Sequence, residues 1–220
     1  SFGLTRLRCA IDRVCNIYLS EKLINPKILE KCIKNEANIF IGAVPSALEI
    51  YMNLFGNYLK KQKNKFYIES GSMVIEKYTV DKINAIFKNN IHFHHYGSTE
   101  LSRSFFTTNK QLIGNEKILG IKSDEIKYKF GKNNELLLKS RYRFKGYLNM
   151  GNLTYKIGKK SLIDQDGYIK TGDAVEVKNG NLFFKSRLKE IINLNGVKYN
   201  PKIIEDKLSE IFNLNDTLIL

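Results

Sequence analysis

One stretch near the middle of the chain gathers residue types that could carry chemistry. HFHHYGSTE, from His92 to Glu100, holds all three histidines of the sequence and ends in a Gly-Ser-Thr-Glu run. Imidazole nitrogens are common metal ligands, whereas a glycine-containing turn with two hydroxyls offers donors to phosphate oxygens. The carboxylate of Glu100 suits a hard cation such as Mg²⁺. The stretch could therefore be a metal site, a phosphate site or the end of a buried strand.

The alternation of side chains along a strand separates the three histidines. His92 and His94 face one side of a strand, whereas His95 faces the other. No cysteine or carboxylate stands nearby at the spacing of a metal site. Buried or pocket-lining histidines are therefore the stronger interpretation, and the turn that follows them is the better candidate for a ligand site.

The residues before this turn predict a parallel sheet with crossover helices, because apolar runs alternate with helical patterns from about residue 25 to 96. Asn25 and Pro26 are suited to the cap and first position of a helix. We expect helices over 25–37, 45–61 and 79–89, and strands over 38–44, 65–70 and 90–96. Ligands of open α/β sheets bind at the carboxyl ends of the strands, where Gly71-Ser72 and Gly97-Ser98-Thr99 stand.

Past Ser104 the pattern changes to short apolar stretches separated by turn signals. Antiparallel strands are expected within 134–148, 166–177, 179–187 and 189–199. Asn179-Gly180 and Asn195-Gly196 are typical hairpin turns, and a last helix starts at Asn200-Pro201. The predicted fold class is thus α/β followed by α+β: a parallel α/β portion, a small antiparallel β-subdomain and the start of a further α+β domain.

Composition limits the kinds of partner without choosing one. A chain of 220 residues with 43% hydrophobic residues can bury a core, and its net charge of +14 suits nucleic acid, an anionic membrane surface or a phosphate-rich small molecule. Lysines spread over solvated faces would give the same charge. The sequence shows neither a membrane-spanning run nor a signal-peptide pattern, so we expect a soluble, cytoplasmic chain. The three cysteines stand among apolar residues and are expected to be core thiols.

Three longer motifs occur in order: YGSTE at 96–100, DGYIKTGD at 166–173 and RLKEIINLNGVKYNPKIIED at 187–206. In this order they resemble the adenylate-forming superfamily of acyl- and aryl-CoA synthetases, luciferases and peptide-synthetase adenylation domains. Weaker similarities to the same family are SFGL at the start, IFIGAVPSALEIY and IESGSM. The resemblance covers essentially the whole chain.

The resemblance implies a reaction in two steps. A carboxylate attacks the α-phosphate of ATP to give an acyl-adenylate and pyrophosphate, and a thiol, usually that of CoA, then takes the acyl group. ATP or AMP, Mg²⁺, CoA and a small carboxylic acid are therefore the expected ligands, and fatty acid metabolism the expected context. The implied domains are 1–104 and 105–186, which belong to the large domain, and 187–220, which begins a mobile C-terminal domain.

The resemblance also implies roles for single residues. Thr99 would bind a phosphate oxygen and Glu100 the Mg²⁺, and both are implied to be catalytic. Asp173 would accept both ribose hydroxyls, because a carboxylate has two acceptor oxygens. Arg187 would donate to the ribose or phosphate. Further nucleotide-binding residues would be Gly71, Ser72, Tyr96, Gly97 and Ser98, the first three beside the adenine.

Two more positions concern the mobile domain that the resemblance implies. Lys189 matches the hinge about which that domain swings between the two half-reactions. Gly196 falls where a loop of the domain faces the thiol channel, so a bulky residue there is expected to impair thioester formation and spare adenylation. Each position also has a plain alternative, a solvated lysine and a hairpin turn.

The pattern is incomplete in places. The glycine-rich phosphate loop is expected upstream of SFGL and the adenylating lysine beyond Leu220, so we expect a truncated chain rather than a degenerate relative. Ser186, Glu190 and Ile203 depart from the family's usual residues. Pro201 favours an acyl-CoA synthetase, whereas the acid itself is not defined by the apolar residues 44–51.

Two other functions remain open on the sequence alone. The +14 charge and the aromatic-basic run KSRYRFKGY would suit a module that binds nucleic acid without catalysis. A relative that binds adenylate without turnover would keep the motifs. Phosphate-driven binding falls steeply with salt and does not need Asp173, whereas adenylate binding does need it.

Overall fold

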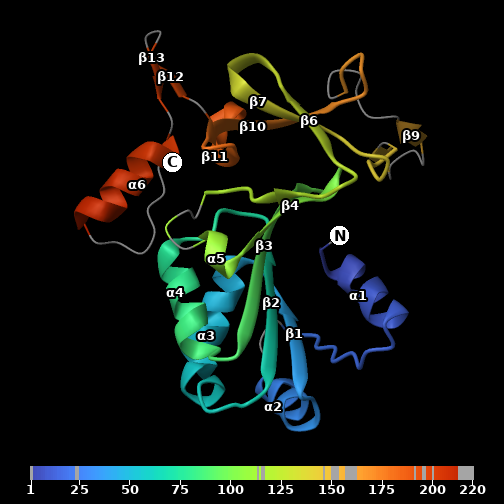
Figure 1. Cartoon of the computed structure of the whole chain (residues 1–220), viewed down its shortest axis with the longest axis vertical. Helices are drawn as coiled ribbons and strands as arrows, with labels where there is room; N and C mark the ends of the chain where they lie inside the picture. Colours follow the sequence, from blue (N-terminus) through green and yellow to red (C-terminus); the bar gives the residue numbers. More distant parts are fainter. Residues whose placement is uncertain are drawn as a thin grey trace. The chain divides into compact units, whose positions relative to one another are not determined.

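The chain forms two compact units, Ser1–Ser123 and Asp124–Leu220, each built on its own sheet (Figure 1). The computed structural model describes residues 2–22, 25–112, 114, 117–145, 147–149, 154–156, 163–190, 192–194, 197–199 and 201–212. None of the helices described there has the length and apolarity needed to cross a membrane. The domain boundaries expected at residues 104 and 186 stay a prediction.

The first unit is a mixed sheet with the strand order β1-β2-β3-β4-β5. The first three strands run parallel, as the expected α/β portion requires. The last two, which the sequence pattern did not predict, run antiparallel. Their bounds are β1 Asn38–Gly42, β2 Lys65–Gly71, β3 Asn90–Ser98, β4 Ser102–Thr108 and β5 Ile121–Lys122. The helices are α1 Phe2–Asp12, α2 Pro26–Asn35, α3 Pro45–Leu59, α4 Lys77–Ile86 and α5 Asn109–Leu112.

Two of the three expected crossover helices are confirmed at their starts, whereas α4 begins at Lys77, two residues before the expected position. Asn25 caps α2 through its side chain, which accepts a hydrogen bond from the backbone N–H of Ile28 at 3.3 Å. Pro45 opens α3 in the same way that Pro26 opens α2. Figure 1 shows α3, α4 and α5 on one side of the sheet and α1 on the other.

The two faces of the first sheet are buried unequally. The face toward α3 and α4 carries the core, with Phe66, Ile68 and Ile83 at most 1% exposed. The opposite face carries aromatic side chains in contact with solvent, and Phe40 is 51% exposed and Phe106 37%. Side chains alternate along each strand, so adjacent residues of β2 and β3 meet very different surroundings.

The second unit is built on an antiparallel sheet with the order β11-β10-β7-β6. Its strands are β6 Lys127–Phe130, β7 Glu135–Lys139, β10 Ile169–Lys178 and β11 Asn181–Arg187. Two hairpins, β8 Tyr147–Asn149 with β9 Thr154–Lys156 and β12 Ile192–Leu194 with β13 Val197–Tyr199, and helix α6 Pro201–Phe212 complete it. Asn179 and Gly180 both have positive φ, as the expected hairpin turn requires.

The cysteines differ from expectation. Cys9 and Cys15 are exposed, so they are not core thiols. Both stand in the first 15 residues, where α1 rests on the sheet with few of its side chains covered. Cys32 is half-buried, and burial raises the pKa of its thiol.

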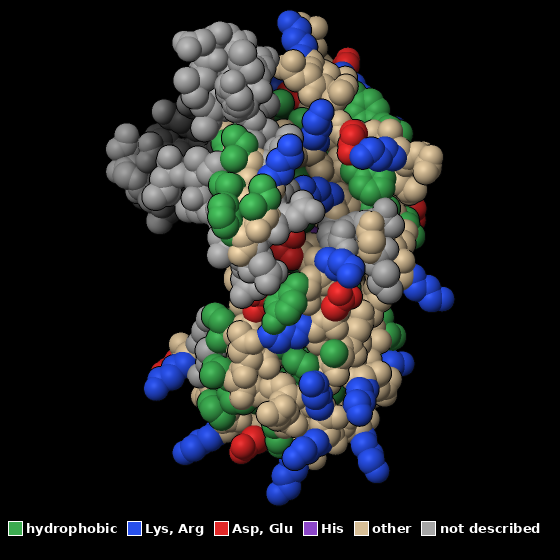
Figure 2. All heavy atoms as spheres, turned by 90° about the vertical axis from the view of Figure 1, so that its left-hand side faces the viewer, with side chains coloured by type: hydrophobic (Ala, Val, Ile, Leu, Met, Phe, Trp, Pro, Cys, Tyr) green, Lys and Arg blue, Asp and Glu red, His purple; other side chains and the backbone are tan. Residues whose placement is uncertain are grey.

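The lysines and arginines are dispersed over the surface that Figure 2 shows. Neutral and apolar side chains stand between them, and acidic side chains are scattered among them. On this face the lysines and arginines are therefore spread out rather than gathered into one basic patch.

Candidate functional site

The Gly-Ser-Thr-Glu run forms a tight hairpin between β3 and β4. Gly97 and Ser98 still belong to β3, opposite Arg103 and Ser102, and the register shifts between Tyr96 and Gly97. A Cβ on Gly97 would collide with the carbonyl oxygen of Ser102, so the hairpin needs glycine at this position.

The side chains of this hairpin turn differ in their exposure to solvent. Ser98 and Thr99 are exposed, which leaves their hydroxyls accessible to a ligand. Glu100 is half-buried beside them. A carboxylate and a hydroxyl on one turn are oxygen donors of the kind that Mg²⁺ takes. Among the described residues, no three His, Cys, Asp or Glu side chains are grouped closely enough to hold a metal.

The predicted adenine-side residues lie on the neighbouring strand end and on β3. Gly71 is the last residue of β2, and a Cβ there would collide with the imidazole of His95. Ser72 is exposed and has a φ of 77°, a left-handed conformation that turns the chain sharply after the strand. Tyr96 packs edge-on against Phe105, with ring centroids 6.0 Å apart.

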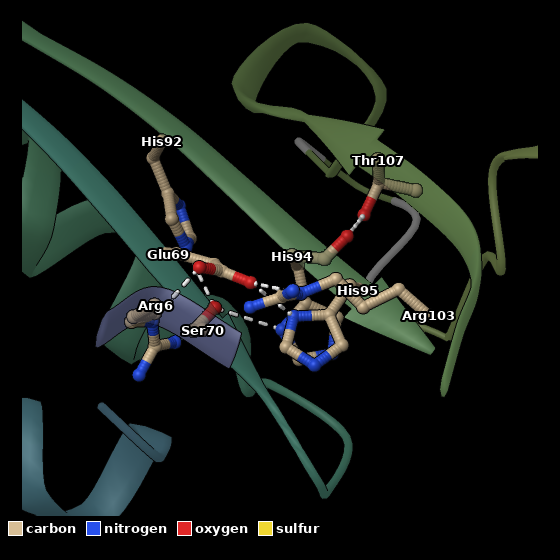
Figure 3. A network of polar contacts seen from close by, with 8 residues as sticks. All are labelled: Arg6, Glu69, Ser70, His92, His94, His95, Arg103 and Thr107. Carbon is tan, nitrogen blue, oxygen red and sulfur yellow. Dashed lines mark hydrogen bonds and ion pairs between the residues drawn. The ribbon is translucent and has the colours of Figure 1, made fainter. Parts of the chain in front are cut away.

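Sequence reasoning missed two clusters that lie on opposite faces of the sheet (Figure 3). In the first, the hydroxyl of Ser70 lies 2.8 Å from Nε2 of His92 and 2.8 Å from Nδ1 of His94. Burial lowers the pKa of His92 to about 4 and, together with the nearby imidazoles, that of His94 to about 3. Both rings are therefore neutral at physiological pH.

The hydroxyl of Ser70 links the two imidazoles of this first cluster, because it is within hydrogen-bond distance of a ring nitrogen of each. His94 also bonds the backbone of Met73, a contact that raises the pKa of its ring while burial lowers it. This polar chain ties β3 to the turn that contains Ser72.

The second cluster is charged. One carboxylate oxygen of Glu69 accepts a hydrogen bond from Nε of Arg6 at 2.9 Å, and the other accepts one from Nε of Arg103 at 2.6 Å. Nδ1 of His95 lies 3.1 Å from that second oxygen. Burial alone would raise the pKa of Glu69, but the hydrogen bonds from His95 and Arg6 and the two positive charges lower it to about 2.

The second unit brings together two of the predicted nucleotide-binding residues. Asp173 on β10 is 3% exposed and lies opposite Arg187 on β11, whose Nε is 2.9 Å from Oδ1 of the carboxylate. The backbone N–H of Asp173 donates to the hydroxyl of Thr171 at 3.1 Å. Gly172, with a φ of 76°, donates its N–H to the carboxylate of Glu135 at 3.0 Å. The carboxylate of Asp173 thus contacts Arg187 of the neighbouring strand, and backbone hydrogen bonds of Gly172 and Asp173 fix β10 at this point.

The remaining predicted positions follow β11. Lys189 is exposed in a short 3₁₀ turn, Leu188–Glu190. Gly196 lies outside the described residues. Strands β12 and β13 pair antiparallel with Leu194 opposite Val197, the register that a hairpin between them requires. The structure therefore groups the residues of the hairpin and the adenine-side turn within the first unit, and Asp173 with Arg187 within the second.

No protein-family model matches the chain. It is 31% identical over 87 residues to the 4-coumarate–CoA ligase CCL1 of Humulus lupulus, a match covering 39% of this chain and 15% of that protein. It is 30% identical over 122 residues to the probable 4-coumarate–CoA ligase 3 of Dictyostelium discoideum, covering 50% of this chain and 21% of the relative. The matches thus take in a small part of both relatives.

The fold agrees with solved structures of o-succinylbenzoate CoA synthetases. The enzyme MenE from Bacillus subtilis, in complex with the acyl-adenylate intermediate OSB-AMP, superposes with a TM-score of 0.75 at 17% identity, over 94% of this chain and 43% of that one. MenE from E. coli gives a TM-score of 0.62 at 20% identity, over 83% and 37%. The matched relatives are CoA ligases, and over the portion that it shares with these solved structures the chain has the fold of adenylate-forming enzymes.

Proposed function

We propose that this chain contributes to an enzyme that activates a carboxylic acid with ATP as an acyl-adenylate and then transfers the acyl group to CoA. The observation that carries this proposal is the pairing of Asp173 with Arg187 across β10 and β11. The buried carboxylate offers two acceptor oxygens for the hydroxyls of a vicinal diol. The guanidinium beside it offers donors for the neighbouring phosphate.

The hairpin of the first unit supports the same proposal. The exposed hydroxyl of Thr99 would donate to a phosphate oxygen, and Gly97 keeps the hairpin compact. The exposed turn after Gly71 would border the adenine, with Ser72 held in place through Met73, His94 and Ser70. Bacillus subtilis MenE has been solved in complex with ATP and Mg²⁺ and with AMP, which are the ligands proposed for this chain.

Magnesium fits the oxygens of Glu100 and Thr99. A single carboxylate is typical of Mg²⁺ sites in which phosphates and water complete the shell, and the described residues hold no larger group of metal ligands. When bound, the ion would neutralise phosphate charge. Thr99 would orient the same phosphate.

Lys189 and Gly196 belong to the second half of the proposed reaction. The exposed 3₁₀ turn around Lys189 follows directly on Arg187, so a rotation there would leave the β10–β11 pair intact. Gly196 would face the thiol. The proposed acceptor of the acyl group is CoA.

The test is a calorimetric titration of the chain with 5′-AMP. Asp173→Asn keeps the size of the side chain and removes its charge, and it is expected to weaken AMP binding by about tenfold to a hundredfold. Glu176→Gln, on the same strand and paired with Lys178 at the surface, is the matched control and should bind AMP as the unmodified chain does.

Salt separates this function from nucleic-acid binding. AMP binding that needs Asp173 should persist at high salt, because one ligand phosphate releases few counterions. Binding of RNA or DNA that falls steeply with salt and is indifferent to Asp173→Asn, with no AMP binding, would replace the proposal with a basic nucleic-acid module.

A further inference from the structure

One face of the sheet in the second unit gathers lysines that the proposed function does not use. Strands β6, β7 and β10 lie side by side in this sheet (Figure 1). Residues directly opposite each other on neighbouring strands, and residues two apart on one strand, share a face. Lys127 lies opposite Lys139, and in the next row Leu137 lies between Lys129 and Lys170. These lysines of the described strands form the lysine face.

Most of the charge on the lysine face has no acidic partner. Lys129 is paired with the carboxylates of Asp164 and Asp166, at 2.6 Å each. Within the described part of the chain, the other three lysines form no ion pair. Like charges directly opposite each other on neighbouring strands repel, so the pairing of Lys127 with Lys139 costs stability. A bound polyanion would offset this repulsion.

The turn that precedes β10 fixes the position of two positive groups. Oδ1 of Asp164 closes this turn by accepting hydrogen bonds from two of its backbone N–H groups, at 3.0 and 2.8 Å. The carbonyl oxygen of Asp166 accepts a hydrogen bond from Nζ of Lys139 at 2.7 Å. That of Gly167 accepts one from Nη1 of Arg143, also at 2.7 Å. Both cations are thus positioned by neutral carbonyl groups, which leave their charge available to a partner.

Aromatic rings accompany these cations. The Tyr168 ring contacts two ammonium groups, with Nζ of Lys129 at 4.5 Å and Nζ of Lys139 at 5.6 Å from its centroid. Tyr142 follows β7 and is 62% exposed, and the Arg141 guanidinium carbon lies 4.8 Å from its ring centroid. An exposed ring beside cations can stack on a nucleic-acid base while the cations contact phosphates.

The lysine face offers little apolar surface to a membrane. Leu137, the apolar residue in the row between Lys129 and Lys170, is 5% exposed. Binding to a membrane surface adds buried apolar area to the attraction between cations and anionic lipids. Cations with an exposed aromatic ring and a covered leucine therefore fit a nucleic acid better than a lipid surface.

We propose that the lysine face, with Arg143 and Tyr142 beside it, binds single-stranded nucleic acid. The lysines and Arg143 contact phosphates, and Tyr142 stacks on a base. The aromatic-basic run KSRYRFKGY, which the proposed function leaves unexplained, supplies both residues and Lys139. This activity goes beyond the proposed function and does not depend on it, because Asp173 and Thr99 take no part.

The test is the fluorescence anisotropy of a labelled single-stranded RNA of about 12 nucleotides, titrated with the chain at several salt concentrations. The unmodified chain should bind this RNA with an affinity that falls steeply as the salt concentration rises. A variant that combines Lys127→Gln with Lys139→Gln should bind at least about tenfold more weakly at low salt. It should also have a shallower slope of log affinity against log salt, by about 1.4, because each lost phosphate contact removes about 0.7 for a single strand.

Two further variants separate stacking and general charge from the lysine face. Tyr142→Ala should weaken RNA binding by about tenfold at every salt concentration and leave the salt slope unchanged. A control that combines Lys88→Gln with Lys185→Gln removes two exposed lysines elsewhere and should bind as the unmodified chain does. Thermal unfolding should show the variant with Lys127→Gln and Lys139→Gln to be at least as stable as the unmodified chain, because it removes a repulsion.

Three outcomes would overturn the nucleic-acid site. They are the absence of RNA binding by the unmodified chain, an equal loss of binding in the control variant, and binding that requires Lys127 and Lys139 to vesicles of phosphatidylserine and phosphatidylcholine but not to RNA. The titration with AMP is scored separately. AMP binding without RNA binding refutes the nucleic-acid site alone, and RNA binding without AMP binding refutes the proposed function alone.

Discussion

The neighbouring histidines His94 and His95 have opposite surroundings, because they lie on opposite faces of the first sheet. His94 faces the helices, where a neutral chain of hydrogen bonds joins it to Ser70 and His92. His95, the next residue, faces the other side and contacts the carboxylate of Glu69 between two arginines. Because a strand alternates its side chains, one step along the sequence separates a neutral polar network from a charged one.

The two faces stabilise their buried polar side chains in different ways. On the helix-covered face the imidazoles stay neutral, and their low pKa values follow from burial. On the other face a carboxylate stays ionised despite burial, because two guanidinium groups and an imidazole surround it. Satisfied neutral networks add rigidity, whereas a buried carboxylate stays stable only while its positive partners remain in place.

The largest effect is expected from removing the carboxylate of the charged cluster. Glu69→Ala leaves two guanidinium groups facing each other, and this should lower the free energy of unfolding by about 3 to 5 kcal/mol. Denaturant unfolding followed by circular dichroism measures it. Asp81→Ala, which breaks the exposed Lys77–Asp81 pair on α4, should cost less than about 0.5 kcal/mol. Equal losses in the two variants would remove the distinction between the cluster and a surface ion pair.

The next effect is a loss of stability in acid. Unfolded imidazoles take up protons below pH about 6.5, whereas His92 and His94 resist protonation to pH about 4 and 3 when folded. The stability that the two neutral rings contribute is therefore fully present above pH about 6.5. It decreases as the pH falls below that value, by up to about 1.4 kcal/mol per pH unit for each ring. The contribution of Glu69 is lost later, as the pH falls from about 4.5 toward 2.

His94→Gln tests the assignment of this slope. The variant should lose the His94 share of the pH dependence between pH 7 and 5, measured as thermal unfolding at several pH values. A stability that does not change over this range in the unmodified chain would mean that the imidazoles are not held neutral by the fold.

The smallest effect compares two buried serines. Ser70→Ala leaves two imidazole nitrogens without their shared hydroxyl and should cost about 1 to 2 kcal/mol. Ser104 is also fully buried, and its hydroxyl has no hydrogen-bond partner within the described part of the chain, so Ser104→Ala should be neutral or slightly stabilising. A larger loss of stability in Ser104→Ala than in Ser70→Ala would contradict the role assigned to the Ser70 hydroxyl.

Much of the fold followed from local pattern. Helices α2 and α3 start where Asn25 and Pro45 predict, and the alternation of β3 places His92 and His94 together. Their partner Ser70 depends on the register of β2 against β3, which no local pattern contains. Arg6 was missed because α1 contacts the sheet through long-range packing alone, although a glutamate inside the apolar run KFYIES was a usable signal for a charged partner.

The pairing of Asp173 with Arg187 shows a similar limit. The Asn179-Gly180 turn predicts a hairpin, and Lys178 opposite Asn181 would continue regularly to Asp173 opposite Ser186. A bulge between Ala174 and Val175 shifts the register by one residue and brings Arg187 opposite Asp173 instead. The resemblance to adenylate-forming enzymes identified the two residues, and the bulge explains why they meet.

The most direct test of the central claim is nuclear magnetic resonance of the ¹⁵N-labelled chain during titration with 5′-AMP. The account predicts saturable shifts at Gly71 to Ser72, at Gly97 to Thr99 and at Gly172 to Asp173, and these shifts should persist at high salt. Shifts confined to lysine-rich surface segments, absent from these three stretches and lost at high salt, would contradict it.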